Sequence, residues 1–365
     1  MRFLITYLLL FAVVVSYSQR GIVPYNVQRI ARVTGKSQSS DTFPNPNKTD
    51  EKYNVGGTDL GIAWDMENDN VGLFFGDTYG NDFKHTPNGG PGNATDWRSN
   101  VLAFTNDKDL SDGLSFTSML SNKGNKDAEE VAHSKHEDNC IGDRTMIPTA
   151  AIHVGNADYV HCMNVKCWGV PGRWTTNFST LYQSLDNGKT WSRCSTVTFS
   201  AASNFAQAAY AKKDGYVYMM GTKSGRDGAV YLARVKEADM IHQDKYEYWN
   251  KDEGWKMKEE RLATPVFEAP VGEMSLSYNR KFQRWIIAYL SEKKKGIVLR
   301  DAEKITGPWN EGKLMVSSKD YPGLYGSFIF PLKDDSDDLY FLMSIWKAYN
   351  VFLMKAKLKL ITNYE

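Results

Sequence analysis

Two aspartates lie in one predicted β-hairpin and have the type and spacing of a catalytic carboxylate pair. Asp59 stands in residues 57–64 (GTDLGIAW) and Asp77 in residues 71–78 (VGLFFGDT), with a polar stretch between them. If the turn is centred on Asn68, the two aspartates are opposite each other on antiparallel strands, roughly 5 Å apart on one face. Repulsion between two such acids raises one pKa and leaves the other low, which divides the pair into an acid and a base. This chemistry is typical of a glycosidase.

The first residues have the pattern of a secretory signal. Arg2 is followed by an apolar run over residues 4–15 and by small residues at the expected cleavage site. We therefore expect residues 1–18 to be removed and the protein to be secreted, periplasmic or on the cell surface. The apolar run is shorter than the roughly 20 residues that a membrane span needs, so no membrane insertion is expected.

Composition favours a single all-β domain over residues 19–365. Aromatic residues make up 13% of the chain, with 10 Trp, 20 Tyr and 29 Gly, as in proteins with many short strands and tight turns. The formal net charge of +1 argues against a nucleic-acid partner, because binding phosphates requires a basic surface. The expected oligomeric state is a monomer.

The cysteines and acidic residues predict no cofactor and no metal site. Cys140, Cys162, Cys167 and Cys194 allow three pairings, and we expect structural thiols or one disulfide. The spacing of Cys162 and Cys167 suits neither a zinc site nor a redox pair. A structural calcium ion in a central channel is the alternative, since oxygen ligands leave little spacing to recognise.

Pairs of apolar strands recur along the chain and predict a five-bladed β-propeller. Five hairpins are expected, each followed in most cases by a further strand. They cover residues 57–78, 149–165, 206–220, 274–290 and 327–344. A strand near residues 27–33 would close the ring beside the last blade. Polar stretches 36–52, 84–96 and 122–138 are expected to be loops.

One turn motif supports the propeller independently. Residues 184–191 (SLDNGKTW) match the Asp-box pattern S-x-D-x-G-x-T-W of sialidase-like propellers. In this motif Asp186 bonds to its own turn, Gly188 takes a positive φ and Trp191 packs against the blade. Asp186 is therefore predicted to be structural and not catalytic.

The chain also resembles a known family. The segments GTDLGIAW, FFGDTYG, MMGTKSGRDGAVYLARV, GEMSLSYNRKFQRWIIAYL and MSIWKAYNVFLMKA, together with residues 160–191, are similar to domain of unknown function 4185, over about residues 50–356. Members of this group have been assigned to glycoside hydrolase family 183, endo-D-arabinanases that cut mycobacterial arabinogalactan and lipoarabinomannan. The resemblance implies a five-bladed propeller and a catalytic aspartate pair, which falls on Asp59 and Asp77.

A third carboxylate has the equivalent position in another hairpin. Glu273 opens the fourth blade as Asp59 opens the first, and innermost strands begin near the central cavity. Glu273 is therefore predicted to act as a general acid or to bind sugar hydroxyls, with a structural bond to a neighbouring blade as the alternative. For Asp59 the alternative role is a hydrogen bond in a turn or between blades at the start of a strand, and for Asp77 it is a strand-end cap bonded to Thr78 or Gly80.

Aromatic and polar residues near loops and strand ends are candidates for sugar binding, because an aromatic face stacks on the apolar side of a furanose ring. The predicted substrate-binding residues are Trp174, Asn177, Arg226, Tyr325, Trp346 and Tyr349. Arg144 resembles the arginine motif of sialidases, but a salt bridge to Asp138 or Asp143 is the preferred interpretation.

We therefore expect a hydrolase that cleaves internal α-D-arabinofuranosyl linkages of a D-arabinan. Asp77, beside Phe74 and Phe75, is expected to be the more buried acid, while Asp59 stays ionised. Carboxylate separation would decide between retention and inversion, and Glu273 would replace one aspartate in an inverting pair. The alternatives are a non-catalytic carbohydrate-binding propeller, another furanosidase, or a sialidase-like hydrolase.

Overall fold

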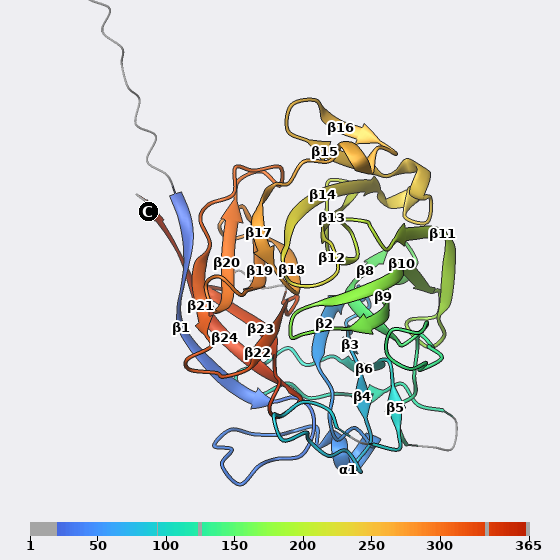
Figure 1. Ribbon diagram of the computed structural model, residues 1–365. Coiled ribbons are helices and arrows are strands. Elements are labelled where there is room, and N and C mark those ends of the chain that lie inside the picture. The colour runs from blue at the N-terminus through green and yellow to red at the C-terminus, as the bar shows by residue number, and fades with distance from the viewer. Residues whose placement is uncertain (1–19, 93, 123–125, 333–335, 363–365) are drawn as a thin grey trace, which may run out of the picture.

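Five antiparallel sheets surround a common axis in the computed structural model, which describes residues 20–92, 94–122, 126–332 and 336–362 (Figure 1). The expected signal segment, residues 1–18, lies outside these ranges. The predicted all-β, five-bladed propeller is confirmed. Each of the five predicted hairpins supplies the first two strands of one sheet.

The inner strand of every blade contacts the inner strands of the two neighbouring blades, which closes the ring. In order around the axis, these strands are β2 (Leu60–Asp65), β8 (Thr145–Val154), β12 (Gln207–Lys213), β18 (Met274–Asn279) and β22 (Leu324–Ile329). Because all five run in the same sense along the axis, their first residues meet at one end of the channel.

The remaining strands of the blades follow outward from these inner strands. The first blade adds β3 (Val71–Phe75), β6 (Val101–Thr105) and β7 (Ser118–Met119), and the second adds β9 (Ala157–Trp168), β10 (Trp174–Ser184) and β11 (Ser192–Ser200). The third adds β13 (Tyr216–Thr222), β14 (Gly228–Lys236), β15 (Glu247–Asn250), β16 (Gly254–Met257) and β17 (Phe267–Val271). The fourth adds β19 (Arg284–Ser291), β20 (Gly296–Ala302) and β21 (Lys313–Ser317).

Both ends of the chain build the fifth blade. Its strands β23 (Asp338–Ile345) and β24 (Asn350–Thr362) follow β22, and β1 (Arg20–Arg32) then pairs with β24 in antiparallel register. The predicted closing strand is therefore confirmed. Since β1 and β24 are at opposite ends of the sequence, this pairing fixes the circular arrangement of the blades.

Few elements lie outside the blades. A small ribbon of β4 (Thr78–Tyr79) and β5 (Trp97–Arg98) extends the first blade. The helices are α1 (Thr49–Tyr53) and the 3-10 turns η1 (Glu237–Asp239), η2 (Gln243–Lys245) and η3 (Glu260–Leu262). Within the described residues no helix has the length and apolar character that crossing a membrane requires.

The Asp-box has the structural role that the sequence predicts. Asp186 accepts hydrogen bonds from the amide and hydroxyl of Thr190 at 2.9 and 2.7 Å, and Gly188 has a φ of +80°. Trp191 packs edge-on against Trp64 and Phe74 of the first blade. The turn thus joins two neighbouring blades, away from the cavity described below.

Candidate active site

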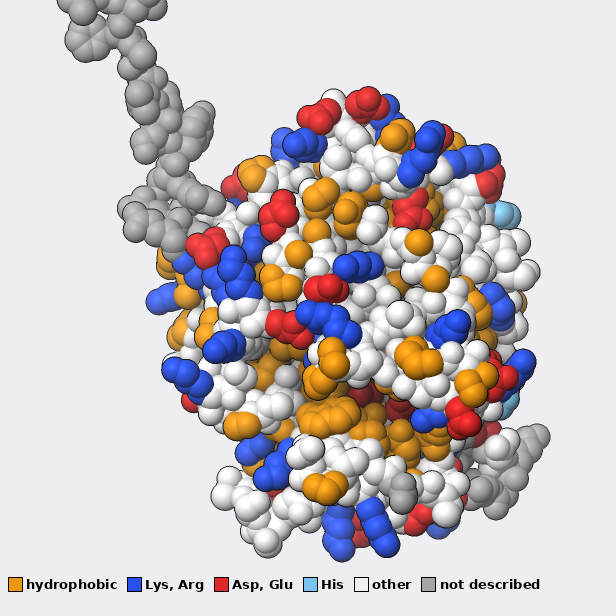
Figure 2. Space-filling view, in the orientation of Figure 1, with side chains coloured by type: hydrophobic (Ala, Val, Ile, Leu, Met, Phe, Trp, Pro, Cys, Tyr) orange, Lys and Arg blue, Asp and Glu red, His pale blue; other side chains and the backbone are white. Residues whose placement is uncertain are grey.

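A cavity of about 670 Å³ lies at the end of the ring where the inner strands begin. Each inner strand contributes a lining residue at its first position or directly before it. These residues are Asp59, Arg144, Gln207, Glu273 and Gly323. Figure 2 shows a hollow on this face of the molecule, with hydrophobic side chains along its wall and acidic side chains within it. Four of the five blades therefore present a polar side chain to this cavity from the start of the inner strand.

Asp59 reaches the cavity from the first hairpin, whose turn is centred on Asn68 as expected. Its register differs from the prediction, because a bulge at Gly61, where φ is +94°, pairs Leu60 with Phe75. The Gly76 amide consequently donates to the Asp59 carbonyl at 3.1 Å. Asp59 therefore lies opposite Gly76, and the predicted direct pairing with Asp77 is wrong by one residue.

The Asp59 carboxyl group is packed closely on one side and bonded on the other. The Tyr325 hydroxyl donates to Oδ2 at 3.0 Å. Oδ1 is buried without a hydrogen-bond partner among the described residues, and a Cβ on Gly76 would lie 2.4 Å from it. Burial, followed by the nearby charge of Asp77, raises the pKa of Asp59 to about 8, against the lowering effect of the Tyr325 bond. Asp59 is therefore mostly protonated at neutral pH.

Asp77 is buried as well, but it receives two hydrogen bonds. The Trp97 indole N–H and the Thr145 hydroxyl both donate to Oδ1, at 2.9 and 2.5 Å. Burial raises the pKa of Asp77 to about 6, and these bonds limit the rise because they favour the charged form. No hydrogen bond from a described residue reaches Oδ2. Asp77 is thus mostly ionised at pH 7, with one oxygen left for a ligand.

These environments reverse the expected roles of the two aspartates. Asp77 is indeed strongly buried, with 7% of its surface exposed, and Asp59 is partly exposed. The surroundings of Asp77 nevertheless do not favour its protonated form, because its two donors stabilise the carboxylate. Asp59 has a single donor and the repulsion of Asp77, so it holds its proton to higher pH.

Glu273 is the third carboxylate of the cavity and forms an ion pair. Arg226 donates from Nε and Nη2 to Oε1 of Glu273 at 3.0 and 2.7 Å. The other oxygen, Oε2, is buried and has no hydrogen-bond partner among the described residues. The guanidinium also lies 5.5 Å from the Tyr325 ring and 5.9 Å from the Trp174 ring. One acceptor oxygen is therefore available beside a fixed cation.

The predicted substrate-binding residues are brought together with one exception. Five of them line the cavity, namely Trp174, Arg226, Tyr325, Trp346 and Tyr349. Trp346 is 44% exposed, whereas Tyr349 is almost fully buried. Asn177 is not part of the lining. Its amide donates to the Gly142 carbonyl and to Asn164, at 2.9 and 2.7 Å, which makes it a structural residue of the second blade.

Several lining residues were missed or misinterpreted in the sequence. Contrary to the preferred interpretation, Arg144 has no ion pair with Asp138 or Asp143, and its Nη1 donates instead to the Glu137 carbonyl at 3.0 Å. Trp97, Tyr79 and Gln207 also line the cavity. Arg144 and Gln207 stand at the start of the inner strands of their blades, as Asp59 and Glu273 do. This shared position could have identified them from the sequence. Tyr79 and Trp97, on the β4–β5 ribbon, carried no comparable pattern.

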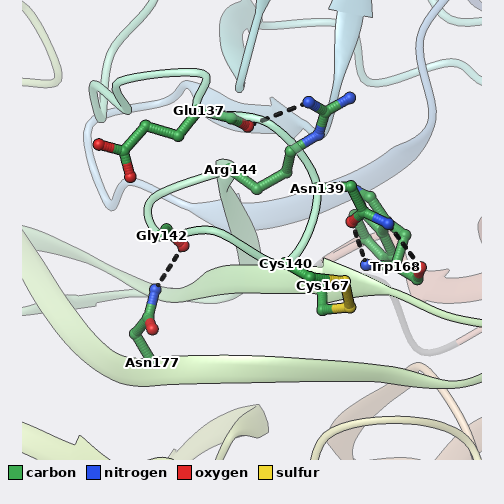
Figure 3. Close-up of a disulfide and its surroundings, with 8 residues drawn as sticks. All are labelled: Glu137, Asn139, Cys140, Gly142, Arg144, Cys167, Trp168 and Asn177. Atoms are coloured by element: carbon green, nitrogen blue, oxygen red, sulfur yellow. Dashed lines mark hydrogen bonds between the residues drawn. A yellow bond between two sulfur atoms is a disulfide. The ribbon is translucent and has the colours of Figure 1, made fainter.

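A disulfide supports the wall beside these residues. Cys140 is bonded to Cys167 at the end of β9 (Figure 3). Cys162 and Cys194 are free and buried. Asn139, next to the disulfide, exchanges two hydrogen bonds with the Trp168 backbone, at 3.0 and 2.7 Å. The expected single bridge therefore holds the segment before β8 against β9. Within the described residues, no group of three His, Cys, Asp or Glu side chains is placed to hold a metal ion.

The fold and the cavity define a five-bladed propeller with a carboxylate-lined pocket at one end of its ring. The chain belongs to the family described as a domain of unknown function, DUF4185, which it matches over residues 44–355. Two curated relatives are notoamide biosynthesis cluster proteins. Protein J' of Aspergillus versicolor is 29% identical over 81% of this chain and 83% of its own length. Protein J of Aspergillus sp. (strain MF297-2) is 28% identical over 81% of both chains.

A solved structure shares the architecture. A Bacteroides ovatus protein, provisionally assigned as a hydrolase, superposes with a TM-score of 0.58 and 13% identity over 84% of this chain and 86% of its own. The α-L-arabinofuranosidase of Podospora anserina gives a TM-score of 0.48 and 9% identity over 92% of this chain and 97% of its own. At such identities these similarities concern the fold alone.

Proposed function

We propose that the protein is an exported glycoside hydrolase that cleaves internal α-D-arabinofuranosyl linkages of a mycobacterial-type D-arabinan. The observation that carries this proposal is the unequal environment of Asp59 and Asp77 around one cavity. A neutral acid and a carboxylate facing the same space are the two groups that glycoside hydrolysis needs. The choice of D-arabinan rests on the resemblance of the motifs around both aspartates to endo-D-arabinanases.

In the proposed reaction Asp59 is the general acid. Its proton passes to the glycosidic oxygen as the bond from that oxygen to the anomeric carbon breaks. Asp77 presents its free Oδ2 to the positive charge that develops on the sugar ring, where it attacks the anomeric carbon or takes a proton from the attacking water. The water oxygen ends on the anomeric carbon, and the proton returns to the carboxylate pair. Product anomers followed by ¹H NMR distinguish the two routes.

The other lining residues bind the sugar. Glu273 offers its unpartnered Oε2 to a ring hydroxyl, and Arg226 orients this carboxylate through two hydrogen bonds to Oε1. Trp174 and Trp346 provide faces on which furanose rings stack. An apolar wall with a few placed polar groups is the usual composition of a small-molecule or sugar pocket.

The raised pKa values of Asp59 and Asp77 set the expected pH dependence of kcat/KM. Catalysis requires Asp77 ionised and Asp59 protonated, so kcat/KM should rise through about pH 6 and fall through about pH 8. A maximum near neutral pH follows.

Release of reducing ends from mycobacterial arabinogalactan tests the proposal. We expect Asp59→Asn and Asp77→Asn to lower the rate at least about 100-fold, as removal of general acid–base catalysis does. Asp69→Asn is the matched control, since Asp69 lies in the exposed turn of the same hairpin. Oligosaccharide products support an endo-acting enzyme, and arabinose alone would move the assignment to an exo-acting furanosidase. Binding of arabinan without any release would favour the carbohydrate-binding alternative.

A substrate with an activated leaving group separates the roles of the two aspartates. A dinitrophenyl arabinofuranoside needs little protonation of its leaving oxygen, so Asp59→Asn should recover most of the wild-type rate on it. Asp77→Asn should remain impaired on the same substrate, because the developing charge still lacks its partner. Equal recovery of both variants would contradict the assignment.

A further inference from the structure

Trp97 connects the buried Asp77 carboxylate to a segment that is distant in sequence. Its indole N–H donates to Asp77 Oδ1 at 2.9 Å from β5, on the small ribbon beside the first blade. The Thr145 hydroxyl shares this acceptor oxygen. Since an indole has a single donor, the position of its ring decides whether this bond forms.

Three side chains hold the Trp97 ring in place. Tyr79 stacks on it with a centroid distance of 6.1 Å and an interplanar angle of 12°. The His136 ring lies at 4.2 Å and the Arg144 guanidinium carbon at 4.7 Å from the ring centroid. A cation above an indole face is attracted by the ring quadrupole, most strongly where water is excluded. The Trp97 donor is therefore fixed by contacts on several sides.

His136 and Arg144 flank a loop, residues 137–143, whose two ends are joined by hydrogen bonds. The Glu137 amide donates to the Asp143 carbonyl at 2.9 Å, and the Asp143 amide donates to the Glu137 carboxylate at 2.6 Å. The Cys140–Cys167 disulfide then ties the segment to β9 (Figure 3).

The imidazole end of this segment is anchored separately. His136 Nε2 is bonded to Glu130 Oε1 at 3.1 Å, and the Ser99 amide donates to the same oxygen at 2.7 Å. His133 bonds to the other oxygen of Glu130. Burial raises the pKa of Glu130, but the bonds from His136, Ser99 and His133, in that order of size, together lower it to about 2, so an ionised carboxylate holds the imidazole.

We propose that Trp97 is a positioning residue for the Asp77 carboxylate, and that Arg144 and His136 act on the reaction by holding its indole and by their position beside that carboxylate. This inference rests on the glycosidase function proposed above. It assigns a role to residues 130–144, part of which falls in the polar stretch 122–138 that the sequence predicts only to be a loop. Trp97 and Arg144 line the cavity, so the same residues also shape the space next to the reacting oxygen.

The charges around Asp77 agree with this role. Asp59, Tyr79, His136, Arg144 and Tyr349 are the titratable or charged groups that interact with it. Burial raises the pKa of Asp77, while Thr145, Trp97, His136 and Arg144 each lower it. Loss of any of these four side chains should therefore move its titration to higher pH.

The test follows the Asp77 carboxyl carbon by ¹³C NMR titration of the full chain, with Asp77→Asn to assign the signal. We expect Trp97→Phe, which keeps a ring but removes the donor, and Arg144→Gln, which removes the charge, each to raise the midpoint. Arg144→Lys keeps the charge without the planar guanidinium and should raise it less. Arg193→Gln is the matched control, because Arg193 lies 4.4 Å from the Phe178 ring, outside the cavity. Its midpoint should equal that of the wild type.

Activity provides the second measurement. On an arabinan substrate, the acid limb of kcat/KM should move upward with the midpoint, and a shift of one unit lowers the rate about tenfold on the acid side. If Arg144 acts through the indole, Arg144→Gln in the Trp97→Phe background should shift the midpoint less than it does in the wild type.

Unchanged midpoints in folded Trp97→Phe and Arg144→Gln proteins would overturn the inference, even if both variants lost activity. The titration uses no substrate, so its result is independent of the proposed function. Shifted midpoints without cleavage of any arabinan would refute the glycosidase and retain the control of Asp77 by Trp97. Thermal unfolding of each variant confirms that the protein measured is folded.

Discussion

Replacing Asp59 with asparagine should lower the rate on arabinan at least about 100-fold and at the same time stabilise the protein at neutral pH. Asparagine has nearly the shape of the protonated carboxyl group that the folded protein holds at pH 7. The folded-state pKa of Asp59 is raised from 3.8 to about 8, whereas the unfolded chain ionises near the ordinary value. Between these values the unfolded state releases a proton that the folded state keeps, so the stability of the wild type falls as pH rises. The free energy of unfolding of Asp59→Asn lacks this pH dependence, because asparagine does not ionise.

The expected gain in the free energy of unfolding of Asp59→Asn follows from the two pKa values of Asp59, in the folded and in the unfolded chain. From pKa 3.8 to pH 7 the difference is 3.2 units, which corresponds to at most about 4 kcal/mol at 1.36 kcal/mol per unit. Part of the Asp59 side chain is open to the cavity, where water screens the charged form, so we expect roughly 2 kcal/mol. At pH 4 the expected gain is below about 0.5 kcal/mol, because the unfolded chain then retains much of its proton.

Urea unfolding followed by tryptophan fluorescence between pH 4 and pH 7 measures this difference. Asp69→Asn, in the exposed turn of the same hairpin, is the control and should match the wild type throughout. The reasoning is refuted if Asp59→Asn is no more stable than the wild type at pH 7. A gain that is the same at every pH would also refute it, since packing and not ionisation would then be the cause.

Three further substitutions test the surroundings of the two aspartates. Tyr325→Phe removes a hydrogen bond that lowers the pKa of Asp59, so the alkaline limb of kcat/KM should move to higher pH; a limb that stays or falls would contradict this. Thr145→Val removes a bond that lowers the pKa of Asp77, so the acid limb should move upward while the alkaline limb stays. Gly76→Ala would place a Cβ 2.4 Å from Asp59 Oδ1, and should lower kcat at least about tenfold by displacing the acid; wild-type kcat would show that the carboxyl group is free to move.

The architecture could be predicted from the sequence because it depends on local patterns. Five apolar hairpins at recurring intervals are sufficient to define five blades, and the turn at residues 184–191 marks one of them. The closing strand could also be predicted, because the last blade needed one more outer strand. The N-terminal segment supplies it by pairing with β24. Residues at equivalent places in two hairpins, Asp59 and Glu273, were also recognisable.

The details of the site depended on contacts between distant segments. The bulge at Gly61 changes the register by one residue, and alternation of apolar residues does not reveal a single bulge. The order of the two pKa values follows from donors on β5 and β8, which lie 20 and 68 positions from Asp77. Asn177 had a suitable position in sequence, but its amide faces Gly142 and Asn164 in the folded chain.

The most direct test of the central claim is a ¹³C titration of both cavity aspartates in the wild-type protein, assigned with Asp59→Asn and Asp77→Asn. We predict two steps, with Asp77 titrating near pH 6 and Asp59 near pH 8. Titration of both groups below about pH 5, or of Asp59 before Asp77, would contradict the division of this pair into an acid and a base.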